Sequence, residues 1–236
     1  MTTPDSTDHT TIHVSVREAR MAVERILMTC GLPKGYVPAV RECILLSQSL
    51  GLAGFDGIRD AHDALTGARL ERMAIVEEAG SALTLDAGQL HAWLVLPTMV
   101  DLAVDLARRR AGATVRVENA LQPDELRIAT ALVSRYGAVA SFGSDGTHGV
   151  VEVRNAARPR SIQEWDPRLQ AALRDGYSFE KSRWREIYAL SNRALAPDSV
   201  TSRRHAGPVL VDAQGRIVGR APVDDETDLR TLTCVN

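Results

Sequence analysis

The sequence is poor in the groups that bind transition metals or form disulfide bonds. Its 236 residues include three cysteines, Cys30, Cys43 and Cys234, and no two of them form a Cys-x-x-Cys pair. An odd number of thiols cannot all pair within one chain, and the cysteines and histidines do not combine at the spacing of a zinc site. We therefore expect reduced thiols and no bound metal.

The sequence also lacks an excess of charge of either sign. It has 28 lysine and arginine residues against 30 aspartate and glutamate residues, interspersed along the chain. The densest basic run, Arg108-Arg109-Arg110, ends a helix-like segment, where cations meet the negative end of the helix dipole. This position favours a role in the helix over a phosphate site, and the composition predicts no nucleic-acid partner.

No long apolar run is present. None of the hydrophobic stretches reaches the length that spans a bilayer, so we expect no membrane partner. The opening residues, MTTPDSTDHTT, lack the basic and apolar regions of a signal peptide, which predicts a cytoplasmic protein. Because they are polar and contain Pro4, residues 1–11 are expected to form a disordered tail.

Glycine-rich nucleotide-binding loops are missing as well. The chain contains neither the Gly-x-Gly-x-x-Gly pattern nor a Walker loop. The text FGSDG is not a nucleophile elbow, because its serine directly follows Gly143. We therefore expect no cofactor.

Two helical patterns follow the polar start. Ser15 and Glu18 have capping-box spacing, and apolar residues then recur at helical intervals until Gly31. A second amphipathic segment begins near Val37 and ends near Gly51. The short connection between the segments predicts a helical hairpin, which with its following connection forms the first predicted unit, residues 12–75.

The next unit, residues 76–156, alternates helix and strand patterns. A strand-like segment from Leu83 precedes a long apolar helix that Pro97 is expected to kink or restart. Branched residues alternate in ATVRVEN, and a helix from 124 to 136 precedes two further strand patterns. The pattern predicts a layered α/β fold, in which helices pack on a sheet beside the N-terminal helical pair. Residues 157–236 are expected to form a linker, a C-terminal helix and a hairpin.

The residues from Ser81 to Gly146 resemble the type-2 malate/L-lactate dehydrogenase family, whose relatives include ketimine reductases. The family's order is a strand, a glycine-containing loop, a long helix, a strand ending in Arg-Asn, a histidine loop, a helix and a strand, and this chain repeats it. Residues 14–58 resemble the family's first helical pair, and residues 177–195 its C-terminal helix. The chain is also similar, over nearly its whole length, to a group of short bacterial proteins that end in text like ALSNRALAPDSVTSRRHAG. The resemblance implies a truncated dehydrogenase-like fold and a homodimer, which the apolar helix around residues 94–104 also favours.

The departures from the dehydrogenase family concern its catalytic histidines and its nucleotide site. Asp56 stands where the family's Asp-Ser-His-Gly element has its histidine, and Gln122 stands where the second histidine would follow the Arg-Asn strand end. The family's central nucleotide-binding region is missing after the strand near Val153. An amide cannot exchange a proton near neutral pH. Because the second histidine and the nucleotide region are both missing, we do not expect the chain to carry out the family's redox chemistry with NAD(P)H.

Asp56 and His91 are the candidate acid/base residues. Asp56 lies in a glycine-rich turn, where a carboxylate often only bonds nearby amides. His91 opens the long helix, and its alternative role is that of a buried or helix-starting histidine.

Five further residues are candidates for substrate binding. Asn119 and Gln122 follow a predicted strand, at positions that the resemblance places near the substrate cleft of the dehydrogenase family. Ser199, Ser202 and Arg203 follow the C-terminal helix, where hydroxyls and a guanidinium suit a carboxylate or phosphate, although a local cap with a solvent-facing arginine fits equally.

Three functions remain open from the sequence. The first is a small-molecule enzyme with a dehydrogenase-like cleft that acts on a 2-oxo, imino or amino acid by cofactor-free proton transfer, as an isomerase, cyclase or lyase. The second is a non-catalytic binding or accessory subunit. The third is a minimal NAD(P)H-dependent reductase, against which the missing nucleotide region weighs most.

Overall fold

The computed structural model describes residues 10–157, 159–195, 209–214 and 217–220. The chain divides into two compact units, Met1–Ala194 and Leu195–Asn236. In the second unit, β8 (Val209–Val211) and β9 (Ile217–Arg220) form an antiparallel pair around the expected turn.

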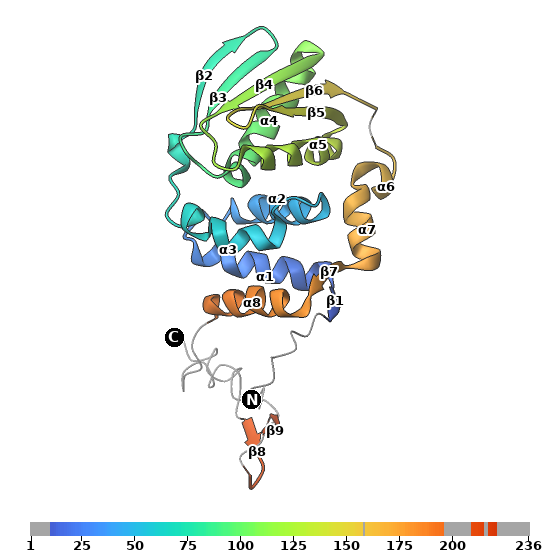
Figure 1. Ribbon diagram of the computed structural model, residues 1–236. Coiled ribbons are helices and arrows are strands. Elements are labelled where there is room, and N and C mark those ends of the chain that lie inside the picture. Colours follow the sequence, from blue (N-terminus) through green and yellow to red (C-terminus); the bar gives the residue numbers. More distant parts are fainter. Residues whose placement is uncertain (1–9, 158, 196–208, 215–216, 221–236) are drawn as a thin grey trace, which may run out of the picture. The chain divides into compact units, whose positions relative to one another are not determined.

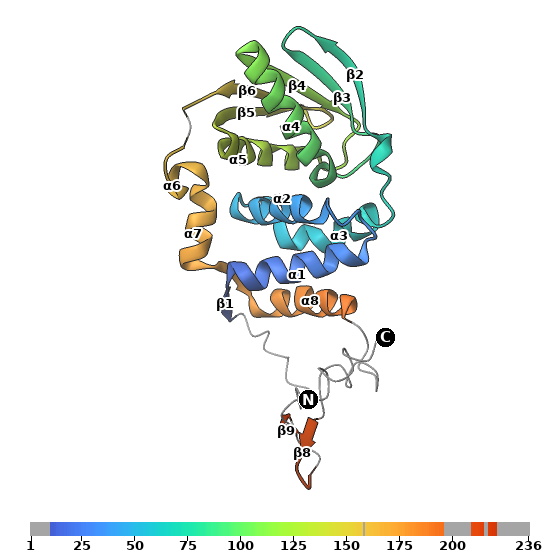
Figure 2. The same cartoon turned by 180° about the vertical axis from the view of Figure 1, so that it is seen from behind.

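Four helices form one layer of the first unit. They are α1 (Val16–Thr29), α2 (Val37–Ser49), α3 (Gly54–Leu65) and α8 (Lys181–Ser191), which lie side by side in Figures 1 and 2. The predicted capping box starts α1: the Ser15 hydroxyl accepts from the Glu18 N–H at 3.2 Å, and Glu18 accepts from the Ser15 N–H at 3.1 Å. The predicted helical pair is therefore confirmed.

A five-stranded sheet forms the second layer, with the strand order β2-β3-β4-β6-β5. The strands are β2 (Ala74–Ala79), β3 (Ala82–Asp86), β4 (Gly112–Glu118), β5 (Ala138–Ser144) and β6 (Gly149–Asn155). Only β3 and β4 are parallel, with Leu83 opposite Val115. The connection between them is α4 (Ala92–Arg110), as parallel neighbours require a crossover. The predicted layered α/β fold is confirmed.

Helices cover one face of this sheet. Val115 and Val117 of β4 are buried, whereas the alternating Thr114 and Arg116 are partly exposed. The covering elements are α4 and the run of η2 (Pro123–Ile128), α5 (Ala129–Leu132) and η3 (Val133–Tyr136) (Figure 1). The single helix predicted over 124–136 is thus a series of short 3₁₀ and α segments.

The long helix α4 lies between the two layers. It contacts α2 on one side and β4 and β6 on the other, and Trp93, Leu96 and Met99 are fully buried. A helix enclosed on both sides is expected to be apolar around much of its circumference. The helix does not restart at Pro97 but continues through it to Arg110. The Tyr36 hydroxyl donates to the Leu94 carbonyl at 2.5 Å, within the turn before the proline.

The remaining elements connect the layers and tie the two ends of this unit together. After the 3₁₀ turn η1 (Leu70–Arg72) and the sheet, α6 (Ile162–Trp165) and α7 (Pro167–Asp175) lead back to the helical layer. There β7 (Tyr177–Glu180) pairs antiparallel with β1 (Thr11–Val14), and η4 (Asn192–Ala194) ends the unit after α8. This pairing places α8 beside α1 and α3, although more than 100 residues separate them in sequence.

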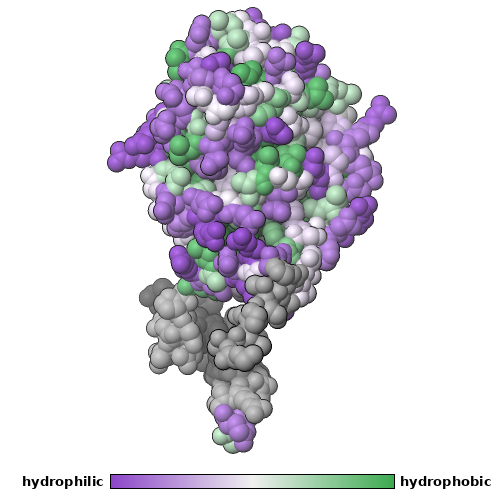
Figure 3. All heavy atoms as spheres, in the orientation of Figure 1, coloured by the Kyte–Doolittle hydropathy of each residue, from purple (hydrophilic) through white to green (hydrophobic). Residues whose placement is uncertain are grey.

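On the face shown in Figure 3, hydrophilic and hydrophobic residues are interspersed. Within the described residues, no helix is both long and apolar enough to cross a membrane.

Candidate functional site

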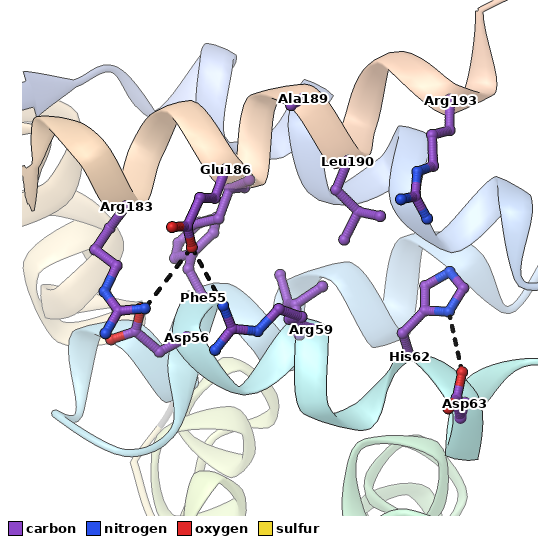
Figure 4. Close-up of a pocket in the computed structure, with 12 residues that line it drawn as sticks. Phe55, Asp56, Arg59, His62, Asp63, Arg183, Glu186, Ala189, Leu190 and Arg193 are labelled. Atoms are coloured by element: carbon purple, nitrogen blue, oxygen red, sulfur yellow. Dashed lines mark hydrogen bonds and ion pairs between the residues drawn. The ribbon is translucent and has the colours of Figure 1, made fainter.

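A pocket of about 530 Å³ lies between α3 and α8 (Figure 4). Its apolar wall comes from Phe55 and Ile58 on α3 and from Ile187 and Leu190 on α8. Each pair is three residues apart, so each helix presents both members on one face. The ring of Phe55 also packs edge-to-face on Phe179 of β7, with centroids 5.0 Å apart. The two helices therefore form a concave site with an apolar surface.

Charged side chains from both helices surround this wall. Glu186 lies between two guanidinium groups: its Oε2 is 3.3 Å from Nη1 of Arg59 and 3.7 Å from Nη1 of Arg183 (Figure 4). All three side chains are substantially exposed, so each of these pairs contributes little to stability. The carboxylate of Glu186 therefore neutralises part of the positive charge of Arg59 and Arg183.

Asp56 lies at one end of the pocket, in the first turn of α3. The sequence predicted a glycine-rich turn here, but α3 begins at Gly54, so Asp56 is helical. A carboxylate is favoured at this position because the N-terminus of a helix carries partial positive charge. Asp56 is exposed and has no hydrogen-bond or ion-pair partner in the described part of the chain.

Arg193 and His62 lie at the other end of the pocket, where Figure 4 shows the guanidinium of Arg193 close to the His62 ring. Nδ1 of His62 is 3.7 Å from Oδ1 of Asp63, whose side chain is fully exposed. Arg193 has no partner among the described residues. This end of the pocket therefore offers, beside an imidazole, a guanidinium that has no hydrogen-bond or ion-pair partner among the described residues.

The structure places His91, the second predicted acid/base residue, outside this pocket. His91 is only 4% exposed and is the N-cap of α4, where its Nδ1 accepts from the Trp93 N–H at 3.2 Å. That bond leaves the ring proton on Nε2. Burial lowers the pKa of His91 to about 4, so the imidazole is neutral near pH 7. His91 therefore takes the helix-starting role that the sequence left open.

Asn119 and Gln122 lie near His91, at the carboxyl ends of β3 and β4. The Asn119 amide donates to Oδ1 of Asp86 at 3.1 Å, and the Gly88 N–H donates to the same oxygen at 2.8 Å. These two donors lower the pKa of Asp86. Asn119 and Gln122 both have a φ of 55°, a left-handed conformation that is uncommon outside glycine. The structure thus brings His91, Asn119 and Gln122 to one edge of the sheet but leaves Asp56 elsewhere.

The other three predicted residues, Ser199, Ser202 and Arg203, lie outside the described residues. Within the part of the chain that the structure describes, no group of three or more histidine, cysteine, aspartate or glutamate residues is placed to hold a metal ion.

Sequence reasoning missed the pocket residues of α8 and the histidine of α3. Asp56, Arg59 and Asp63 follow helical spacing, which was the available signal for one charged face. Arg183, Glu186 and Arg193 belong to the predicted C-terminal helix region, but nothing in the sequence pairs that region with α3.

A buried carboxylate, Glu125, was also missed. It is 4% exposed, and its oxygens accept from the Ser47 hydroxyl at 2.7 Å, the Ala53 N–H at 2.8 Å and the Trp93 indole N–H at 2.6 Å. The Ser47 hydroxyl in turn accepts from the Gly54 N–H at 2.8 Å. Glu125 therefore joins η2, α2, α4 and the start of α3 through a fully hydrogen-bonded network.

The fold of the chain is similar to the folds of solved dehydrogenase structures. The chain is similar to a dehydrogenase from Sinorhizobium meliloti, with a TM-score of 0.57 and 9% identity over 77% of this chain and 100% of that one. It is also similar to malate dehydrogenase from Pyrococcus horikoshii OT3, with a TM-score of 0.51 and 14% identity over 68% of this chain, which spans about half (51%) of that enzyme. No family model and no curated protein matches the sequence. At these identities the likeness concerns the fold alone.

Proposed function

We propose that the chain is a cytoplasmic small-molecule enzyme that acts on a 2-oxo, imino or amino acid by proton transfer without a redox cofactor. Asp56 is the acid/base residue, and the pocket between α3 and α8 is the site. The observation that carries this proposal is the exposed Asp56 carboxylate, which lines a concave pocket and has no partner among the described residues. Two buried, unpaired thiols, Cys30 and Cys43, fit a reducing compartment.

The chemistry follows from the groups that face one another. An oxygen of Asp56 accepts a proton from a carbon next to the carbonyl or imine carbon, and the electron pair of that C–H bond moves into an enolate or enamine. The guanidinium of Arg183, which Figure 4 shows at the same end of the pocket as Asp56, stabilises negative charge on the substrate carboxylate. The proton then returns from Asp56 to the same or a neighbouring carbon, so the cycle needs no oxidant or reductant.

The second candidate is a non-catalytic binding or accessory subunit that uses the same pocket. One observation favours it: within the described residues, no second acid/base group lies within hydrogen-bond distance of Asp56. The pocket would then select a ligand without converting it.

Deuterium exchange distinguishes these functions. The full chain is incubated in D₂O, without NADH or NADPH, with pyruvate, 2-oxobutanoate and a panel of cyclic imino acids and amino acids, and loss of C–H signals is followed by ¹H NMR. The enzyme proposal predicts exchange faster than in buffer for at least one compound. Asp56→Asn is expected to lower that rate by about 10²-fold, the usual scale for removing a general base.

Asp60→Asn is the matched control, because Asp60 is an exposed carboxylate one turn further along α3 that does not line the pocket. It is expected to leave the exchange rate unchanged. Equal rates in wild type and Asp56→Asn would contradict the catalytic proposal. Oxidation of NADH by the purified chain in a parallel assay would instead support the reductase.

A further inference from the structure

We infer that the α3–α8 pocket binds an elongated zwitterion, a straight-chain amino acid whose ammonium group and carboxylate lie at its opposite ends. The inference rests on the proposed function for the choice of site and goes beyond it, because it names a class of ligand that spans the whole pocket and not the compound that Asp56 deprotonates. The ammonium group binds Asp56, and the carboxylate binds Arg193 and His62.

The first support is the pairing of charges inside the pocket. Arg59 and Arg183 share Glu186 at 3.3 and 3.7 Å, so these three side chains have partners in the empty site. Asp56 and Arg193 have no partner within the described residues. A ligand with one positive and one negative group can pair its positive group with Asp56 and its negative group with Arg193.

The net charge of the lining is the second support. Three arginines face three carboxylates, those of Asp56, Asp63 and Glu186, and His62 is the remaining titratable lining residue. A lining with balanced charge favours a ligand without net charge over a dianion or a simple amine. A zwitterion fulfils this condition.

The distance between the two ends is the third support. Asp56 lies at one end of the pocket and Arg193 next to His62 at the other (Figure 4). Asp56 and His62 are six residues apart on α3, which corresponds to roughly 9 Å along the helix axis at about 1.5 Å per residue. The ammonium and carboxylate groups of an α-amino acid share one carbon atom and cannot reach both ends.

The surface between these ends determines what joins the two charged groups. Phe55, Ile58, Ile187 and Leu190 form it, and none of them offers a side-chain hydrogen bond. Phe55, Ile58 and Ile187 are only 1%, 1% and 8% exposed, so the apolar area removed from water is mainly that of the ligand, and a chain of methylene groups gains about 25 cal/mol for each Å². The geometry therefore favours an aliphatic spacer over a sugar or a peptide bond.

Two isomers with the same atoms test this inference by isothermal titration calorimetry on the full chain. In 5-aminopentanoate the charged groups are far apart, and in 2-aminopentanoate they are adjacent. We expect 5-aminopentanoate to bind at least about fivefold more tightly, on the scale of one partly exposed charge pair. Pentanoate and pentylamine, which each lack one charge, are expected to bind more weakly than 5-aminopentanoate as well.

Two variants test which residue binds which charged group of the ligand. Asp56→Asn is expected to remove the tighter binding of 5-aminopentanoate relative to pentanoate, which lacks the ammonium group. Arg193→Gln is expected to remove its tighter binding relative to pentylamine, which lacks the carboxylate. The control Arg110→Gln changes an exposed arginine at the end of α4 and is expected to change neither ratio. Equal affinity for the two isomers, or tighter binding of 2-aminopentanoate, would overturn the inference.

The outcome is separable from that of the proposed function. Selective binding of 5-aminopentanoate without deuterium exchange would leave the inference standing and refute the catalytic proposal. Exchange of a 2-oxo acid that depends on Asp56, without the isomer preference, would do the opposite.

Discussion

His91 shows how burial decides the role of a titratable residue. Its Nδ1 accepts the Trp93 N–H at the start of α4, and its ring lies against the Trp93 indole with centroids 4.4 Å apart. Desolvation lowers its pKa to about 4, and no charged group contributes to this shift. The residue therefore caps the helix as a neutral imidazole at physiological pH.

This burial predicts a pH dependence of the free energy of unfolding. The unfolded chain, in which the histidine has its usual pKa of about 6.5, binds more protons than the folded chain between pH 6.5 and 4. The contribution of His91 to the free energy of unfolding is therefore fully present above pH 6.5 and is lost as the pH falls toward 4. Between pH 7 and pH 5 the loss from this residue is about 2 kcal/mol.

His91→Asn tests this prediction, because asparagine keeps an acceptor at the N-cap but does not titrate. Urea unfolding at pH 7 and pH 5 should show a difference between the two pH values that is smaller in the variant by about 2 kcal/mol. His13→Asn, at an exposed position on β1, serves as the control. The same pH dependence in His91→Asn and wild type would contradict this account.

At the scale of elements, α3 is capped by groups from outside itself. Its N-cap, Ala53, has no polar side chain. The Ala53 N–H donates to Glu125 and the Gly54 N–H to Ser47, while the Phe55 N–H donates to Gln48 at 3.1 Å. A buried carboxylate at this end is favoured by the three donors that it accepts and by the helix dipole.

We predict that Glu125→Gln lowers the free energy of unfolding by about 2 to 3 kcal/mol. The substituted amide has one acceptor oxygen, so its NH₂ group faces a donor that has no other partner. Asp124→Asn, at the exposed neighbouring position, is the control and should change stability by less than about 0.5 kcal/mol. Urea unfolding measures both, and equal effects of the two substitutions would show that Glu125 does not cap α3.

The two ways of starting a helix explain what could be predicted from the sequence. The cap of α1 is local, since Ser15 and Glu18 carry it, and that helix was predicted correctly. The caps of α3 come from α2 and η2, so the residues from Gly54 to Gly57 alone indicate a turn. The pocket was missed for a similar reason: Asp56 was recognised, but the position of the α8 residues that line the pocket with it depends on the pairing of β1 with β7.

At the scale of the whole molecule, two layers enclose α4. Its apolar circumference, which favoured a homodimer at the sequence level, is covered within the chain by α2 and the sheet. The homodimer therefore remains a prediction that rests on the resemblance to dimeric dehydrogenases alone. The layered fold was predictable because strand alternation and helical periodicity are local, whereas the burial of a helix on two sides is not.

The central claim is that the working site lies between α3 and α8 and not at the sheet edge beside His91. Methyl NMR of isoleucine-labelled protein tests this directly during titration with pyruvate, 2-aminopentanoate and 5-aminopentanoate. The account predicts saturable shifts of the Ile58 and Ile187 δ1 methyl signals, because both side chains line the pocket, with Ile128 beside Glu125 unchanged. Shifts at Ile128 without shifts at Ile58 and Ile187, or no shift with any of the three compounds, would contradict it.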